Sequence, residues 1–216
     1  MALSNIDKLT TYEYVYTEQE VDSILTDYFD VMDIDDTQKE KRKDLAKQIR
    51  DSLLFLFVLI EVAYEYDYLT YDNILSQFRN QFQQSVFGNI VIDSYMEQYI
   101  QKVTKDVVDT TFKNLDLINS TYWTSDERAI IVGENEANSI LNYEELQEAI
   151  EQGYTMKTWL TENDNRVRKT HRSVDKKTIP IEDYFMFPDC RMLMPHDYDN
   201  GTDKELANCR CTLKYS

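Results

Sequence analysis

The placement of proline limits most strongly what this chain can fold into. All three prolines, Pro180, Pro188 and Pro195, lie in the last quarter of the 216 residues, together with both histidines and all three cysteines. Proline interrupts the interior of a helix more strongly than any other residue. The long stretch before residue 153 contains no proline, so long helices can form there. That stretch is typical of one helix following another. The residues that could carry a specific chemistry lie within 157–211.

Apolar residues recur at helical spacing through the first 150 residues. Ile74, Phe78, Phe82 and Val86 follow one another at intervals of four and form one helical face. The structural interpretation of such faces is packing of helix against helix. We predict helices over about 17–32, 37–66, 70–87, 90–118, 125–140 and 142–152.

Local signals place several helix ends. Capping boxes of Thr17 with Glu20 and of Thr37 with Glu40 are expected to open the first two helices. Gly88 is expected to end the third helix in a left-handed conformation. The charged start of the second helix, KEKRKD at 39–44, is expected to be solvated, whereas its second half is almost wholly apolar.

After Gly153 the amino-acid composition changes, and Thr, Tyr and Trp are mixed with Lys. Such segments favour strands, which we predict within 154–161, 178–187 and 209–215. The predicted fold class is therefore mainly α, with a helical N-terminal half and a small α+β C-terminal domain. The predicted domains are 1–122 and 123–216.

The charge is large, acidic and unevenly placed. The whole chain carries −17; residues 1–153 hold 12 basic and 30 acidic residues, a net −18, and residues 154–216 hold 11 and 10, a net +1. Residues 1–153, with this large negative charge, are expected to repel nucleic acid. Only a local basic cluster could contact phosphate. That basic cluster, which otherwise reads as a solvated turn, comprises Arg166, Arg168, Lys169, Arg172, Lys176 and Lys177.

Several function classes find little support. An odd number of cysteines and the lack of a visible signal peptide favour a reducing cytoplasm. The apolar run 52–60 is too short to span a membrane. The acidic run 33–36 lacks the glycine and the terminal Glu of a calcium loop and reads as solvated. No glycine-rich phosphate loop, HExxH or GxSxG is present.

The cysteines and histidines leave two site interpretations open. Cys209 and Cys211, two apart on a predicted strand, point to one face, and His171, His196 or Cys190 could complete a tetrahedral zinc site. Alternatively, Cys190 or Cys209 could act as a thiolate nucleophile with His171 or His196 as base, although no oxyanion-hole signature accompanies them.

An ordered set of short motifs resembles a known family. KTW at 157–159, DNRVRKTH at 164–171, Asp175, Phe185, Pro195-His196-Asp197 and NCRC at 208–211 are similar to the C-terminal domain of phage Mu protein F-like minor head proteins. Arg128-Ala129 and ENEAN at 134–138 fit the helix before it. The sequence departs from the family at Lys176 and at His196, both of which stand where glycine is usual.

The motif residues also suggest a structural role. Asn163 or Asp164 could cap a short helix, and an arginine could pair with Asp197 or Glu134. A polar network would then hold a domain too small for a large core. The residues predicted for this network are Asp164, Arg166, Arg168, His171, Asp197, Asn208 and Arg210.

The resemblance implies a non-enzymatic minor head protein of a tailed phage, acting in head assembly, DNA packaging or DNA delivery. The expected partners are the portal protein and capsid or scaffold proteins, contacted through residues 1–122, with possible non-specific DNA contact and neither membrane nor small-molecule substrate. The expected location is the capsid interior, and the host cytoplasm during assembly. No cofactor is expected, although cysteine pairs near positions 168 and 171 in some relatives look like zinc ligands.

Two rival interpretations stay open beside that role. One is a zinc-dependent nucleic-acid-processing enzyme built on the C-terminal domain. The other is an accessory of a polymorphic toxin, which is disfavoured because no toxin module follows Ser216.

Overall fold

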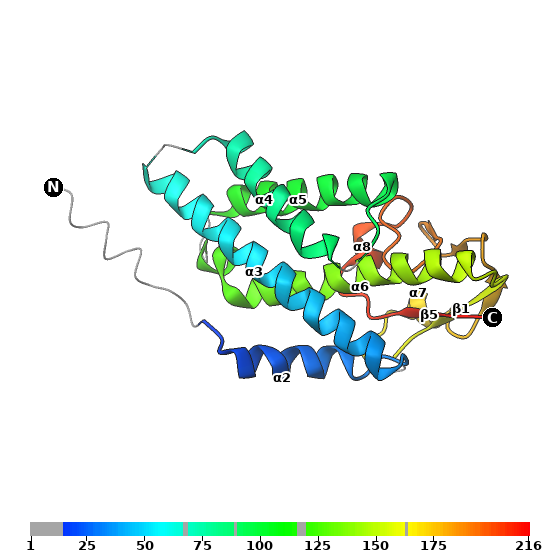
Figure 1. Ribbon diagram of the computed structural model, residues 1–216. Coiled ribbons are helices and arrows are strands. Elements are labelled where there is room, and N and C mark those ends of the chain that lie inside the picture. The colour runs from blue at the N-terminus through cyan, green and yellow to red at the C-terminus, as the bar shows by residue number, and fades with distance from the viewer. Residues whose placement is uncertain (1–14, 67–68, 89, 116–119, 163) are drawn as a thin grey trace. The chain divides into compact units, whose positions relative to one another are not determined.

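A computed structural model describes residues 15–66, 69–88, 90–115, 120–162 and 164–216 (Figure 1). It confirms the predicted class: the chain is mostly helical, with small antiparallel sheets in its C-terminal part. The long helices are α2 (Glu18–Phe29), α3 (Asp36–Tyr66), α4 (Tyr71–Phe87), α5 (Ser94–Asn114) and α6 (Asp126–Glu151). The short ones are η1 (Ser120–Thr124), α7 (Lys169–Arg172) and α8 (Asp203–Leu206).

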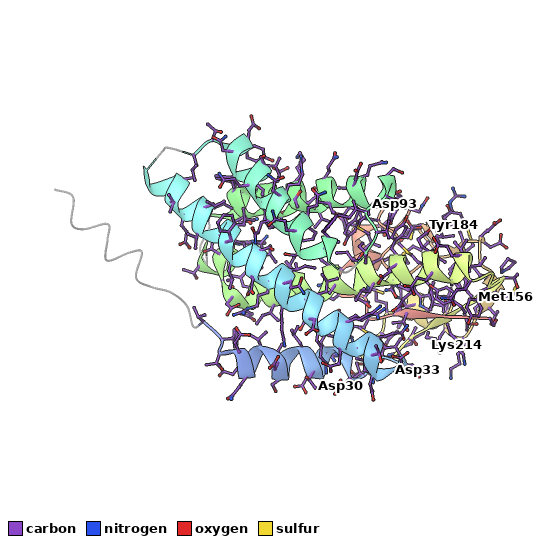
Figure 2. The ribbon with its side chains drawn as sticks, in the orientation of Figure 1. Asp30, Asp33, Asp93, Met156, Tyr184 and Lys214 are labelled. Atoms are coloured by element: carbon purple, nitrogen blue, oxygen red, sulfur yellow. The ribbon has the colours of Figure 1, made fainter. Side chains whose placement is uncertain are left out.

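The strands are shorter than predicted. They are β1 (Met156–Leu160), β2 (Thr178–Pro180), β3 (Phe185–Met186), β4 (Arg191–Met192) and β5 (Thr212–Tyr215). β1 lies between β2 and β5 in an antiparallel sheet, and β3 pairs with β4 in a separate two-stranded one. Met156 on β1 and Lys214 on β5 are labelled in Figure 2. The predicted strand 178–187 is thus two strands separated by a turn.

Side-chain caps begin several helices. The Thr17–Glu20 capping box is confirmed, with Thr17 N donating to Glu20 Oε2 at 2.8 Å. The second predicted box is wrong: Asp35, not Thr37, caps α3 by accepting from Gln38 N. Asp93, labelled in Figure 2, caps α5, so this helix begins four residues later than predicted.

Two predicted helix ends are wrong. Gly88 does end α4, but with a right-handed backbone (φ −77°) rather than the expected left-handed one. The two helices predicted over 125–140 and 142–152 are one continuous helix, α6. Asn142 was expected at a break, yet it continues the helix because its buried side chain finds hydrogen-bond partners outside α6.

The chain divides into two compact units that do not follow its order. Unit 1 comprises residues 1–23 and 47–132, and unit 2 comprises residues 24–46 and 133–216. Unit 2 therefore takes residues from both predicted regions. The predicted division at 122/123 stays a prediction about which part of the chain folds by itself.

Unit 1 has an apolar helical core. α4 packs along α5 (Figure 1), and Ile74, Phe78, Phe82 and Val86 are fully buried, as their spacing predicts. Two buried polar contacts lie inside the unit: Ser52 and Ser85 share a hydrogen bond of 2.6 Å between their hydroxyls. Arg50 Nε and Nη2 donate to the two carboxylate oxygens of buried Asp126, at 2.6 and 2.7 Å.

Unit 2 is held by one fully buried arginine. Arg42, on α3, donates to both carboxylate oxygens of Glu145 at 2.7 and 3.0 Å and to Asn138 Oδ1 at 3.0 Å. The expectation that residues 39–44 are all solvated is wrong at this position. Arg42 lies three and four residues before the buried Leu45 and Ala46, and so belongs to the buried face of α3.

Among the described residues, no helix is long and apolar enough to cross a membrane.

Candidate functional site

Trp159 organises the side chains around the candidate site in unit 2. It lies on the central strand β1 and is completely buried. Its ring contacts those of His171, Phe185 and Phe187 edge to face, with centroids 5.7, 5.0 and 5.4 Å away. This aromatic packing fixes the His171 ring, which α7 carries, against the sheet domain.

His171, Cys209 and Cys211 meet inside this domain. His171 Nδ1 lies 3.3 Å from Cys211 Sγ and 3.6 Å from Cys209 Sγ. The three ligand atoms all lie within 4.8 Å of one another, and all three residues are buried. Both cysteines are free thiols, and they precede β5 rather than lying on it as predicted. Three of the five predicted metal residues are thus brought together; we call them the His-Cys-Cys cluster.

The other nitrogen of His171 faces a buried carboxylate. His171 Nε2 lies 3.1 Å from Glu205 Oε2, and Glu205, on α8, is completely buried. Thr170 Oγ1 donates to the same oxygen at 2.7 Å, which fixes the carboxylate in place. Glu205 could not be predicted from the sequence, because a single acidic residue in a polar loop carries no periodic or motif signal.

His196 lies beside the cluster. Its Nε2 is 2.6 Å from the Cys209 carbonyl oxygen. The residue is buried and has a left-handed backbone, with φ of 62°. The third cysteine, Cys190, is half-buried and is not part of the cluster.

Two amides of α6 hold the backbone that carries the thiols. Asn138 Nδ2 donates to the carbonyl oxygens of Cys209 and Cys211, at 3.1 and 3.4 Å, and Asn142 Nδ2 donates to that of Cys211 at 3.3 Å. Their amide oxygens in turn accept from Arg42. The buried arginine is therefore coupled to the segment 209–211 through these two amides.

The two thiols differ in acidity. Burial alone would raise the pKa of Cys209, but hydrogen bonds from Cys211, His171 and His196 bring that pKa well below its usual value. The pKa of Cys211 is raised, by its hydrogen bond to Cys209 and by burial. The pKa values of the two thiols are thus shifted in opposite directions, as expected for two adjacent titrating groups.

The residues of the predicted polar network form separate contacts. Asp164 accepts from Arg210 Nη2 at 2.6 Å and from Arg166 Nε at 3.4 Å. Asp197 is not bonded to them; it accepts from Leu193 N and Asn200, and so closes its own turn. The Asn208 side chain pairs with that of Asn135 on α6, at 3.0 Å.

Most of the basic cluster faces solvent. Arg168 is half-buried and donates to the Ala207 carbonyl, and the remaining five members are exposed. Exposed Arg172 also donates to the Asp164 carbonyl at 2.8 Å. The expected cap at Asp164 is wrong, because α7 begins only at Lys169 and Arg168 occupies its N-cap position without a side-chain cap bond. Asn163, the alternative cap, lies outside the described residues.

Comparisons with known proteins give two matches. The family model described as "Phage Mu protein F like protein" matches residues 80–214. The NAD(+)–arginine ADP-ribosyltransferase EFV of Enterococcus faecalis (strain ATCC 700802 / V583) is 26% identical over 128 residues, which are 55% of this chain and 26% of that protein. The chain thus spans about a quarter of the length of that curated relative. No solved structure matches the chain significantly.

Proposed function

The chain belongs to the family of phage Mu protein F-like proteins, whose model matches more than half of it, and from this premise we propose that it is a minor head protein of a tailed phage. In this proposal it joins the portal and the procapsid interior and acts in head assembly, DNA packaging or DNA delivery. It is made in the host cytoplasm and ends inside the virion. The family match is the observation that carries the proposal.

The charge supports a protein partner for the first part of the chain. Residues 1–153 carry a net −18, so their carboxylates oppose the release of counterions that drives binding to DNA. The same charge complements a basic surface on a neighbouring head protein and would set the orientation of docking. We therefore assign the portal or capsid contact to residues within 1–122.

The two most exposed large apolar side chains among the described residues lie in that region. Phe87 ends α4 and Val91 follows it in the loop before α5, with exposed fractions of 73% and 85%. A pair of strongly exposed apolar side chains so close in sequence offers apolar area that a partner could bury. Phe87 and Val91 are our candidates for the anchors of the portal contact.

The proposal includes no enzymatic activity. The ADP-ribosyltransferase name belongs to a protein of which this chain matches about a quarter, at 26% identity, so it does not carry that activity over. In unit 2, the cluster residues are buried and enclosed by aromatic rings. Such enclosure suits a structural centre better than attack on a large substrate.

The test is incorporation of full-length variants into procapsids. Changing Phe87 and Val91 together to Ser should reduce the amount that co-purifies with procapsids and with isolated portal, about tenfold if one anchor's worth of binding energy is lost. The control is Met186→Ser, which removes a side chain that is 62% exposed in unit 2.

Full-length protein is preferable to truncation because residues 24–46 belong to unit 2. Normal incorporation of the Phe87/Val91 variant would move the binding surface elsewhere. Complete absence of the wild-type protein from procapsids and virions would overturn the proposed function itself.

A further inference from the structure

We propose that His171, Cys209 and Cys211 bind a zinc ion, with His196 as the fourth ligand. This inference does not depend on the role in the head. It rests on the spacing of the ligand atoms, on the group that orients His171 and on the position of His196.

The spacing is that of a tetrahedral site. With zinc–nitrogen bonds of about 2.0–2.1 Å and zinc–sulfur bonds of about 2.3 Å, tetrahedral angles place a nitrogen and a sulfur ligand about 3.6 Å apart. His171 Nδ1 lies 3.3 and 3.6 Å from the two sulfurs. The two edges of the tetrahedron that join His171 to the sulfurs are thus already present.

Glu205 orients the imidazole as metal sites require. A histidine that binds zinc usually donates its other N–H to a carboxylate, which fixes the tautomer and raises the basicity of the ligating nitrogen. His171 Nε2 lies 3.1 Å from Glu205 Oε2 without making a hydrogen bond in this geometry, while Nδ1 faces the two sulfurs. If Nδ1 binds zinc, the proton of the imidazole is on Nε2 and faces this carboxylate. Glu205 itself is held by Thr170.

Enclosure and ligand chemistry favour zinc over harder cations. Thiolate and imidazole ligands suit zinc, whereas magnesium and calcium prefer oxygen. Each of the three residues is at most 3% exposed, so no surface position is offered to a substrate. Asn138 and Asn142 hold the carbonyl groups of 209 and 211 and thereby fix the backbone between the two thiols.

His196 is the group that closes the site. Its Nε2 lies 2.6 Å from the Cys209 carbonyl oxygen, so it stands next to one ligand residue. It is not among the residues whose ligand atoms all lie within 4.8 Å of one another, so binding requires its ring to turn from that carbonyl towards the metal. Its backbone is left-handed, φ 62°, which is unfavourable for any residue with a side chain and persists only where the surroundings enforce it. With four protein ligands the zinc would be structural.

The first experiment measures the metal in full-length protein purified without chelator. We expect about one equivalent of zinc per chain, a melting temperature that falls in EDTA, and, after exchange into cobalt, the absorption of thiolate-bound cobalt. Less than a tenth of an equivalent, together with no thiolate–cobalt absorption and no effect of EDTA, would overturn the proposal and leave the cluster as packed thiols.

Variants locate the metal. Cys209→Ser, Cys211→Ser and His171→Ala should each abolish the thiolate–cobalt spectrum or weaken cobalt binding by at least tenfold. Cys190→Ser is the matched control, because this third cysteine lies outside the cluster and should bind cobalt as the wild type does. Equal loss in Cys190→Ser, or undiminished binding in Cys209→Ser, would contradict the assignment.

Two further variants test the remaining roles. His196→Ala should retain metal but with weaker affinity and a changed cobalt spectrum; an unchanged spectrum and affinity would remove His196 from the ligand set. Glu205→Gln keeps the shape of a positioning residue but not its charge, and it should weaken zinc about 10- to 100-fold in competition with a chelator. Asp203→Asn, on the exposed side of the same short helix, is its control.

Discussion

Arg42 and Glu145 stand 103 residues apart in the sequence and form a bidentate ion pair inside unit 2, with N–O distances of 2.7 and 3.0 Å. The arginine side chain is wholly buried and the Glu145 side chain is 12% exposed. A buried charge is tolerated only when its donors are matched, and here the two amides of α6 and the Gln38 carbonyl oxygen accept the remaining hydrogen bonds. This pair joins the start of α3 to α6, whose Asn138 and Asn142 hold the segment that carries the thiols.

Removing Arg42 should therefore be costly. We expect Arg42→Ala to lower the free energy of unfolding by about 3–5 kcal/mol, because it leaves Glu145 and two amides without their partner. Lys41→Ala, which removes the exposed neighbouring cation, should change it by no more than about 0.5 kcal/mol. Urea titration measures both, and equal small effects would show that the pair contributes little.

The raised pKa of Glu134 predicts that the stability of the protein depends on pH. Burial raises its pKa from 4.5 to about 7, so the folded chain holds a proton that the unfolded chain releases. The stability that this proton confers is complete below about pH 4.5 and is lost as pH rises through 7. Glu134→Gln has no such loss. Relative to wild type, it should gain roughly 1–3 kcal/mol in unfolding free energy between pH 5 and pH 8.

The control for that prediction is Glu151→Gln, which alters an exposed carboxyl group at the end of the same helix. Its difference from wild type should be the same at pH 5 and at pH 8. A Glu134→Gln variant that follows the wild-type pH profile throughout would show that this carboxyl group is not the source.

The basic cluster should give weak, sequence-independent binding to duplex DNA. Each phosphate contact contributes a slope of about −0.9 in log affinity against log salt. Changing Lys169, Lys176 and Lys177 to Gln should therefore make the slope shallower by up to about 2.7. The matched control changes three exposed lysines of α5, Lys102, Lys105 and Lys113, to Gln and should leave the slope unchanged.

The proposal that the chain has no enzymatic activity is also testable. Full-length protein incubated with NAD+ and agmatine, a small guanidine acceptor, should neither consume NAD+ nor form an ADP-ribosylated product above the rate without protein. Sustained turnover that increases with protein concentration would contradict the non-enzymatic proposal.

Local patterns predicted the parts of the fold that depend on neighbours in sequence. The stripe Ile74, Phe78, Phe82 and Val86 and the Thr17–Glu20 box each involve residues at most four apart along one helix, and they are confirmed. The burial of Arg42 was missed because its partner is over a hundred residues away. The break expected near Asn142 was wrong for the same reason, since its partners lie outside the helix.

The candidate site divides along the same line. Cys209 and Cys211 share a side at a spacing of two, and His171 stood in a distinctive motif, so their meeting could be predicted. The separation of Asp197 from Asp164 and Arg166 could not, because loop conformation decides which carboxylate an arginine reaches. Cys190 belongs to no motif pair, so the sequence does not predict whether it lies near the other two cysteines.

Unit 2 combines an early and a late segment of the chain, so it cannot fold completely until the late segment has been synthesised. Residues 24–46 leave the ribosome early, but the rest of unit 2 begins only at residue 133. At about 5–20 residues per second, Arg42 waits roughly 5–20 s before Glu145 is even synthesised. Residues 47–132 have no such delay. The nascent chain should therefore form its middle first and recruit its early helices last, and messages truncated before residue 145 should yield chains that proteases remove.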